Sequence, residues 1–206
     1  AALEDNPYVF KPRDDKLANL NAQLGLHLNR EPSQYFEHAK AYFSGAVGWD
    51  QWAFVGYQGI ADLAARIGDN EIADLITQAI SHLPNEPLVA LCQCLENQSL
   101  PDGLASSLSA KLESEIADAA VLAALVRGLS QAPERDRDSA IRKALSAEFA
   151  TNPEVLAAIG GRAWEALGNP EIALSYLETL ANKEVDQAIF NHCISDLLRI
   201  STLQQP

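Results

Sequence analysis

The chain lacks methionine altogether and has only three cysteines among its 206 residues. A small, odd number of cysteines provides no disulfide framework and fits a reducing compartment. No apolar run approaches the roughly 18 residues of a membrane-spanning helix. The N-terminus also lacks the charged and then apolar pattern of a secretion signal. These absences predict a soluble, cytoplasmic protein with no membrane partner.

Signatures of catalysis and of cofactor binding are missing as well. There is no Gly-x-Ser-x-Gly nucleophile elbow and no phosphate-binding loop. Cys92 and Cys94 lie two positions apart on an expected helix, so their side chains point about 200° apart and cannot share one metal ion. The four histidines form no i, i+4 metal pair. We therefore expect no cofactor, no metal and no enzymatic activity.

Basic residues are scarce relative to acidic ones, and the net charge is −13. Residues 1–57 hold seven acids and five bases, whereas residues 58–206 hold twenty-one acids and ten bases. An acidic surface repels phosphate backbones, which argues against a nucleic-acid partner. The same charge favours a protein or peptide partner that carries basic residues.

An apolar helical pattern with a fixed period of 34 residues runs through most of the chain. Each repeat has apolar residues at i, i+3 and i+7, the spacing of one helical face. A period of this length is typical of stacked helical hairpins. The pattern predicts an all-α fold, an irregular α-solenoid of the tetratricopeptide or HEAT kind. The five triplets are Phe54/Tyr57/Ala61, Leu88/Leu91/Leu95, Leu122/Leu125/Leu129, Leu156/Ile159/Ala163 and Phe190/Cys193/Leu197.

Helix limits follow from the prolines and glycines that interrupt this pattern. Gly68 and Gly168 are each expected to end one helix. In both cases Asp or Asn follows as the cap of the next helix, and Glu lies in the first turn of that helix. Residues 130–138 are expected as an exposed, charged loop. No segment alternates with period 2, so we expect no sheet. About eleven helices are predicted, at residues 14–29, 33–44, 50–67, 71–83, 86–97, 101–113, 117–131, 135–149, 153–167, 170–181 and 184–200.

The first quarter of the chain differs from the rest, because ten of the fourteen aromatic residues lie between positions 8 and 57. The 34-residue pattern also fails before Phe54. We therefore distinguish an aromatic segment, residues 1–53, from helical-hairpin repeats, residues 54–206, within one continuous domain. The aromatic side chains either pack within the domain or anchor a partner, since Trp and Tyr dominate binding hot spots. The candidate partner-binding residues are Tyr8, Phe10, Lys11, Arg13, Tyr35, His38, Trp49, Asp50, Trp52 and Tyr57.

Several local motifs resemble a known family. They are Asn6-Pro7-Tyr8 with Lys11-Pro12-Arg13, Ala41-Tyr42-Phe43-Ser44-Gly45 before Gly48-Trp49-Asp50, and Gly56-Tyr57-Gln58-Gly59. In these motifs the chain resembles a family of uncharacterised proteobacterial proteins. The resemblance implies a bacterial, cytoplasmic domain of a longer chain, with a further region upstream, and it brings no catalytic residues. The turn Gly68-x-x-Glu71-x-Ala73 also has weak similarity to tetratricopeptide repeats.

Three functions fit these observations. The first is a protein–protein interaction or scaffold module, because a helical solenoid offers a continuous groove to peptides and partner helices. The second is an assembly role in which the repeats stack end to end as a homodimer. The third is a regulatory appendage of an enzyme whose active part lies upstream.

Overall fold

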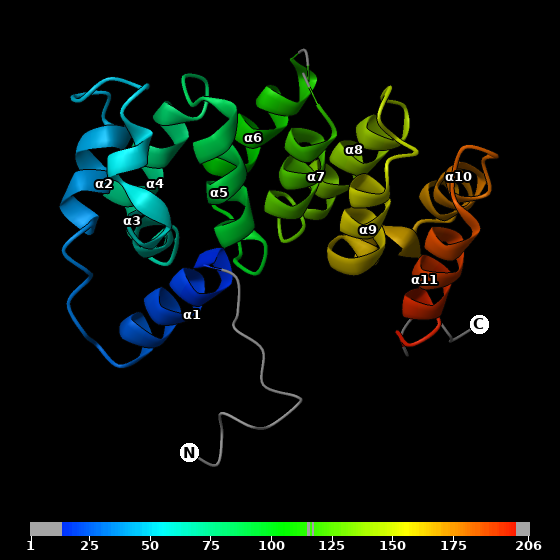
Figure 1. Ribbon diagram of the computed structural model, residues 1–206, viewed down its shortest axis with the longest axis horizontal. Coiled ribbons are helices and arrows are strands. Elements are labelled where there is room, and N and C mark those ends of the chain that lie inside the picture. The colour runs from blue at the N-terminus through cyan, green and yellow to red at the C-terminus, as the bar shows by residue number, and fades with distance from the viewer. Residues whose placement is uncertain (1–13, 115, 117, 201–206) are drawn as a thin grey trace.

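The computed structural model describes residues 14–114, 116 and 118–200, and it consists of helices stacked in two layers (Figure 1). Within these residues it contains eleven α-helices, two short 3-10 helices and no strand. The expectation of an all-α solenoid with about eleven helices is therefore confirmed.

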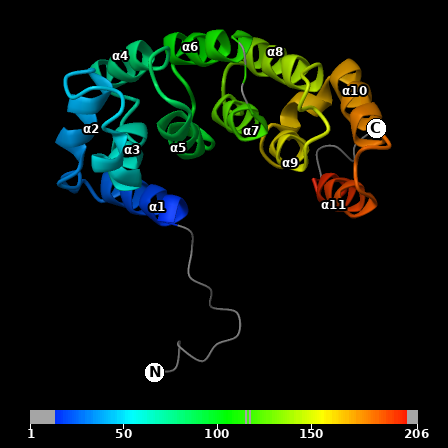
Figure 2. The ribbon, with the colours of Figure 1, turned by 45° about the horizontal axis from the view of Figure 1, so that its top comes forward.

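The two layers form an arc, which is visible when the top of the molecule is turned toward the reader (Figure 2). The outer, convex layer comprises α2 (Phe36–Phe43), α4 (Asn70–Ala79), α6 (Asp102–Glu113), α8 (Glu134–Leu145) and α10 (Pro170–Leu180). The inner, concave layer comprises α3 (Gly56–Ala64), α5 (Asn85–Leu95), α7 (Ala119–Gly128), α9 (Pro153–Arg162) and α11 (Gln187–Leu197). Helix α1 (Asp14–His27) packs on α3 and α5 at one end of the inner layer. The 3-10 helices are η1 (Trp52–Phe54) and η2 (Trp164–Gly168).

From α5 onward the inner helices keep the 34-residue period, whereas the outer helices from α4 onward do not. Helices α5, α7, α9 and α11 begin at residues 85, 119, 153 and 187, so successive starts lie 34 residues apart. Helices α4, α6, α8 and α10 begin at residues 70, 102, 134 and 170, with spacings of 32, 32 and 36. From α5 to α11 each inner helix packs against the next, and the constant spacing lets each one present the same face to its neighbours.

Asp or Asn side chains begin several of the helices, as the sequence indicates. Asp69 accepts a hydrogen bond from the backbone N–H of Glu71 at 2.8 Å, and Asn169 accepts one from Glu171 at 3.0 Å. Asp118 caps α7 in the same way, by accepting from the N–H of Val121 at 2.8 Å. Each cap satisfies an N–H group that has no partner inside the helix.

The apolar triplets form the core in the middle of the arc but not at its beginning. The nine residues of the second, third and fourth triplets are all buried. Seven of them lie on α5, α7 or α9, while Leu129 and Ala163 directly follow α7 and α9. On α11, Cys193 is buried while Phe190 and Leu197 are half-buried, because α11 is the last helix among the described residues. The first triplet is wrong: Phe54 is 76% exposed and Tyr57 is also exposed.

The expected helix over residues 50–67 is likewise wrong, and this explains the failure of the first triplet. Trp49 and Asp50 lie in a turn, η1 follows, and Gly56 has a φ of +64° that separates η1 from α3. Phe54 therefore does not share a helical face with Ala61, and Asp50 does not cap a helix. The expectation of an exposed loop over residues 130–138 also needs correction, because Ser130 and Asp138 are buried and α8 begins at Glu134.

The three cysteines are free and buried within this core. Burial raises the pKa of the Cys92 thiol from 9.0 to about 12, with a further contribution from Cys94. The pKa of Cys94 also rises to about 12, first through burial and then through Asp15. Both thiols therefore stay protonated in the folded state at pH values where the same thiols begin to ionise in the unfolded chain.

We predict that these thiols are protected from Ellman's reagent in the folded protein, because the thiolate is the reactive form and the reagent cannot reach it. Three thiols should react after denaturation at pH 8. Since the folded-state pKa values of Cys92 and Cys94 are raised, their contribution to stability is complete below pH 9 and is lost as pH rises toward 12. Fast labelling of either residue in the native protein would contradict the buried arrangement.

Candidate docking surface

The aromatic residues before α3 and in its first turn divide into a packed group and an open group. Trp49 belongs to the packed group: its ring stacks on His82, with centroids 5.4 Å apart, and meets Tyr42 edge-on at 5.6 Å. The Tyr42 hydroxyl donates a hydrogen bond to the carbonyl oxygen of Trp49 at 2.8 Å. Burial, with a smaller contribution from Asp50, raises the pKa of Tyr42 to about 12. Trp49 thus fixes the turn before α3 rather than facing solvent.

Trp52 and Tyr57 form the open group, at the rim of the concave face. Trp52 Nε1 donates to Glu86 Oε2 at 2.7 Å, and its ring meets Tyr57 edge-on at 6.4 Å. These side chains border an open cavity of about 310 Å³ near the N-terminal ends of α5 and α7, together with Asp118. Two aromatic rings beside two carboxylates suit a cationic side chain, through cation–π attraction and charge. We call Trp52, Tyr57, Glu86 and Asp118 the aromatic corner.

A cluster of charges lies further along the same face, around the carboxylate of Glu96. This side chain is almost completely buried at the end of α5, and it pairs with one cation from each of three other helices. Lys16 Nζ of α1 lies 2.5 Å from Glu96 Oε1, while Arg127 of α7 and Arg162 of α9 each lie 3.4 Å from Glu96 Oε2. The Glu96 backbone carbonyl also accepts from the Ser130 hydroxyl at 2.8 Å. This Glu96 cluster connects α1, α5, α7 and α9 across the concave face.

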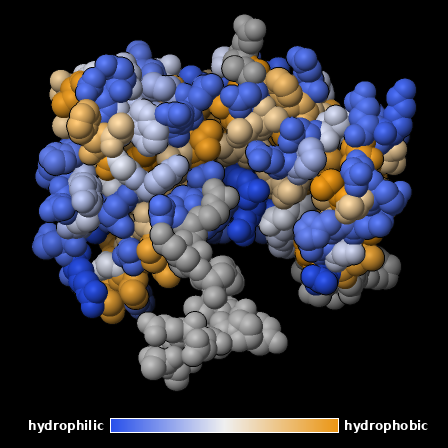
Figure 3. Space-filling view, in the orientation of Figure 1, coloured by the Kyte–Doolittle hydropathy of each residue, from blue (hydrophilic) through white to orange (hydrophobic). Residues whose placement is uncertain are grey.

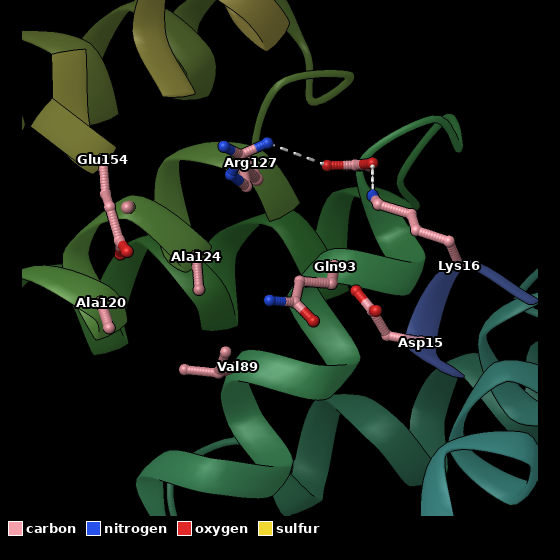
Figure 4. A pocket seen from close by; sticks show the side chains of 10 residues that line it. Asp15, Lys16, Val89, Gln93, Ala120, Ala124, Arg127 and Glu154 are labelled. Carbon is pink, nitrogen blue, oxygen red and sulfur yellow. Dashed lines mark hydrogen bonds and ion pairs between the residues drawn. The ribbon is translucent and has the colours of Figure 1, made fainter. Parts of the chain in front are cut away.

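Two neighbouring cavities lie between the aromatic corner and the Glu96 cluster, and we call the two together the groove. The second cavity, of about 210 Å³, is bordered by Gln93 and by three members of the Glu96 cluster, Lys16, Glu96 and Arg127. It shares Val89 and Ala120 with the cavity at the aromatic corner. Figure 4 shows Lys16 and Arg127, both of which pair with Glu96, at one side of this cavity and Ala120 and Val89 at the other. Figure 3 shows strongly hydrophilic side chains in the hollowed middle of this face.

Helix α1 adds an apolar surface beside the groove. It buries the small face formed by Ala18, Ala22 and Asp15 and leaves Leu17, Leu20 and Leu24 exposed. Hydrophobic surface is visible over α1 in Figure 3. A third cavity, of about 400 Å³, joins this surface to the exposed aromatic residues Tyr35, Phe54 and Tyr57.

The described part of the chain offers binding surfaces but no candidate metal site. Among the residues that the structure describes, no three His, Cys, Asp or Glu side chains come together in a way that could hold a metal ion. None of the described helices is both long enough and apolar enough to cross a bilayer.

Comparison with known proteins places the chain in a family. Residues 1–206 match the model of a family described as "Protein of unknown function (DUF3549)". The chain belongs to this family. The predicted resemblance to an uncharacterised family is thus confirmed as a domain of unknown function. No curated protein and no solved structure matches the chain.

In this DUF3549 chain, the residues proposed from sequence lie in different places. Tyr35 and Tyr57 are exposed and border cavities, Trp52 borders the groove, and Trp49 is packed. His38 and Asp50 are exposed but border none of the cavities described above. Tyr8, Phe10, Lys11 and Arg13 lie outside the described residues. Partner binding by any of them stays a prediction.

Sequence reasoning missed the Glu96 cluster and the exposed face of α1. Lys16 lies 80 residues from Glu96, and nothing in the local sequence indicates that they meet. The leucines of α1 do carry a signal, because they repeat at i, i+3 and i+7 in a segment almost free of charge. Their spacing indicates an apolar helical face, but only the structure shows that this face points away from the core.

Proposed function

We propose that this chain is a protein–protein interaction module that holds a helix or an extended segment of a partner protein in the concave groove. The observation that carries the proposal is that the two cavities of the groove, one at the aromatic corner and one at the Glu96 cluster, share Val89 and Ala120 in their linings. Small side chains at these positions let a partner backbone approach closely. The aromatic corner supplies the rigid, amphipathic rings on which binding hot spots are built.

A basic partner fits this groove best. Glu86 and Asp118 lie beside the two rings of the aromatic corner, which suits a lysine or arginine side chain. The net charge of −11 over residues 58–206 attracts a basic segment at longer range. In this proposal the module acts in the cytoplasm, which agrees with its three free cysteines. It has no catalytic group of its own, and it binds neither nucleic acid nor membrane.

Site-specific photocrosslinking in the source cell tests this function. We predict that a benzophenone side chain at Ala120, in the groove, crosslinks a defined partner. The same group at Gln78, exposed on the outer helix α4, should not. The Ala120 crosslink should decrease at least about 10-fold with Tyr57→Ala, the expected loss for a hot-spot ring. In cell extracts it should also weaken as salt is added, because charge steers the partner.

Two outcomes would overturn the proposal. One is an equal set of crosslinks from Ala120 and Gln78, which would mean that the groove is not preferred. The other is an Ala120 crosslink that is unaffected by Tyr57→Ala in a variant with an unchanged melting temperature. Tyr57 is exposed and meets Trp52 only edge-on, so this substitution should leave the fold intact.

A further inference from the structure

We infer that the exposed leucine face of α1 is a self-association surface on which the α1 helix of a second copy of this chain docks. The inference is independent of the concave groove, since Leu20 and Leu24 border neither groove cavity.

The burial of α1 is the reverse of that of an ordinary amphipathic helix. Its inward face carries Asp15, Ala18 and Ala22, each less than 7% exposed. Its opposite face carries the large apolar residues, with Leu17 39%, Leu20 62% and Leu24 47% exposed. Leu28, one turn beyond Leu24, is 45% exposed. The helix thus keeps its larger apolar face for contact outside its own domain.

This apolar face extends beyond the helix. Leu17 lines the same cavity as Tyr35 and Phe54, so the leucine face continues onto the exposed aromatic residues before α3. Phe54, at 76% exposure, is the most exposed of the large hydrophobic residues described. A single helix pair covers little surface, and this continuation brings the patch closer to the size of stable interfaces.

The charge distribution identifies the occupant as a second copy. Residues 17–29 contain no Asp, Glu, Lys or Arg, although the chain as a whole has a net charge of −13. Two copies of so acidic a chain repel each other over most of their surface. At the uncharged face of α1 the two copies can meet without this electrostatic repulsion. Depletion of charged residues is also typical of interface cores.

The pattern along α1 also complements itself when two copies run antiparallel about a two-fold axis. Leu17, Leu20 and Leu24 follow the alternating three- and four-residue spacing of a helix–helix seam. With the axis near the middle of this stripe, Leu17 of one copy lies opposite Leu24 of the other. The first turn, with Asp14, then faces the basic end formed by His27 and Arg30. Antiparallel helix dipoles add to this complementarity.

Sedimentation equilibrium of the complete 206-residue chain tests the inference. The weight-average mass should rise from that of a monomer to that of a dimer as concentration increases. Leu20→Asp should raise the dimer dissociation constant at least about 100-fold, because it buries a charge in the seam. The matched control is Leu174→Asp on α10, where the leucine is 59% exposed at the far end of the arc. This control should leave the dissociation constant unchanged.

Thermal melts at low concentration separate folding from association. Both aspartate variants should melt as the monomeric parent does, since both leucines are mainly exposed. A chain that stays monomeric at every concentration would overturn the inference, as would a dimer that Leu20→Asp leaves intact. A dimer lost in Leu174→Asp would assign the interface to the α10–α11 end. A monomer whose Leu20 face crosslinks a different protein in the cell would assign the face to that protein.

Discussion

Replacing Leu125 with alanine should lower the free energy of unfolding by about 3–4 kcal/mol. The side chain is completely buried in α7, and α7 packs against α5 on one side and α9 on the other. Removing it leaves a cavity at the centre of the inner layer. In a stacked array each helix pair is stabilised mainly by its neighbours, so a central cavity weakens two interfaces at once. Urea denaturation followed by circular dichroism measures the loss.

Leu174→Ala is the matched control, because it makes the same chemical change at a residue that is 59% exposed. Its effect should stay below about 0.5 kcal/mol. Equal losses in the two variants would mean that the inner layer does not form the core. A much smaller loss for Leu125→Ala would mean that neighbouring helices collapse into the space and that the array is loosely packed.

The second large effect is expected for Glu96→Gln, which should cost about 2–3 kcal/mol. The substitution keeps the size of the side chain but leaves Lys16, Arg127 and Arg162 around a neutral amide. The three cations are partly exposed, so water compensates for some of the lost charge and the estimate lies below that for a fully buried pair. Because Lys16 connects α1 to this cluster, hydrogen exchange should rise most in residues 14–27.

Glu113→Gln provides the control for the Glu96 substitution. Glu113 pairs with Lys143 at 3.1 Å, and both side chains are well exposed. Such surface pairs contribute little, so the expected loss is below about 0.5 kcal/mol. Added salt should reduce the difference between the parent and Glu96→Gln only slightly, since the carboxylate is buried. A similar loss in both variants, or no change in exchange over α1, would refute a connecting role for Glu96.

The sequence predicts the helical layers well because their signals are local. Leu88, Leu122 and Leu156 recur at a fixed interval, and caps such as Asp69 and Asn169 mark where helices begin. Both signals depend on residues within a few turns of one another. Neither requires knowledge of how distant segments meet.

The candidate surface is less predictable because it depends on local breaks and on distant contacts. Phe54 follows the 34-residue pattern in sequence, yet the positive φ of Gly56 moves it off the helical face of Ala61. Glu96 follows an apolar run and looks like an ordinary surface acid at a helix end. Only the folding of Lys16, Arg127 and Arg162 onto one face makes it the centre of a network.

The constant spacing of the inner helices has a consequence for how such chains change in length. From α5 to α11 the inner starts never depart from 34 residues, while the outer starts drift by up to four. When the segment before an outer helix is longer, the segment after it is therefore shorter, and the distance between the two flanking inner helices stays the same. We therefore expect the convex side to tolerate small insertions and deletions that occur in compensating pairs. On the concave side, growth or shrinkage of the molecule should proceed by whole hairpins.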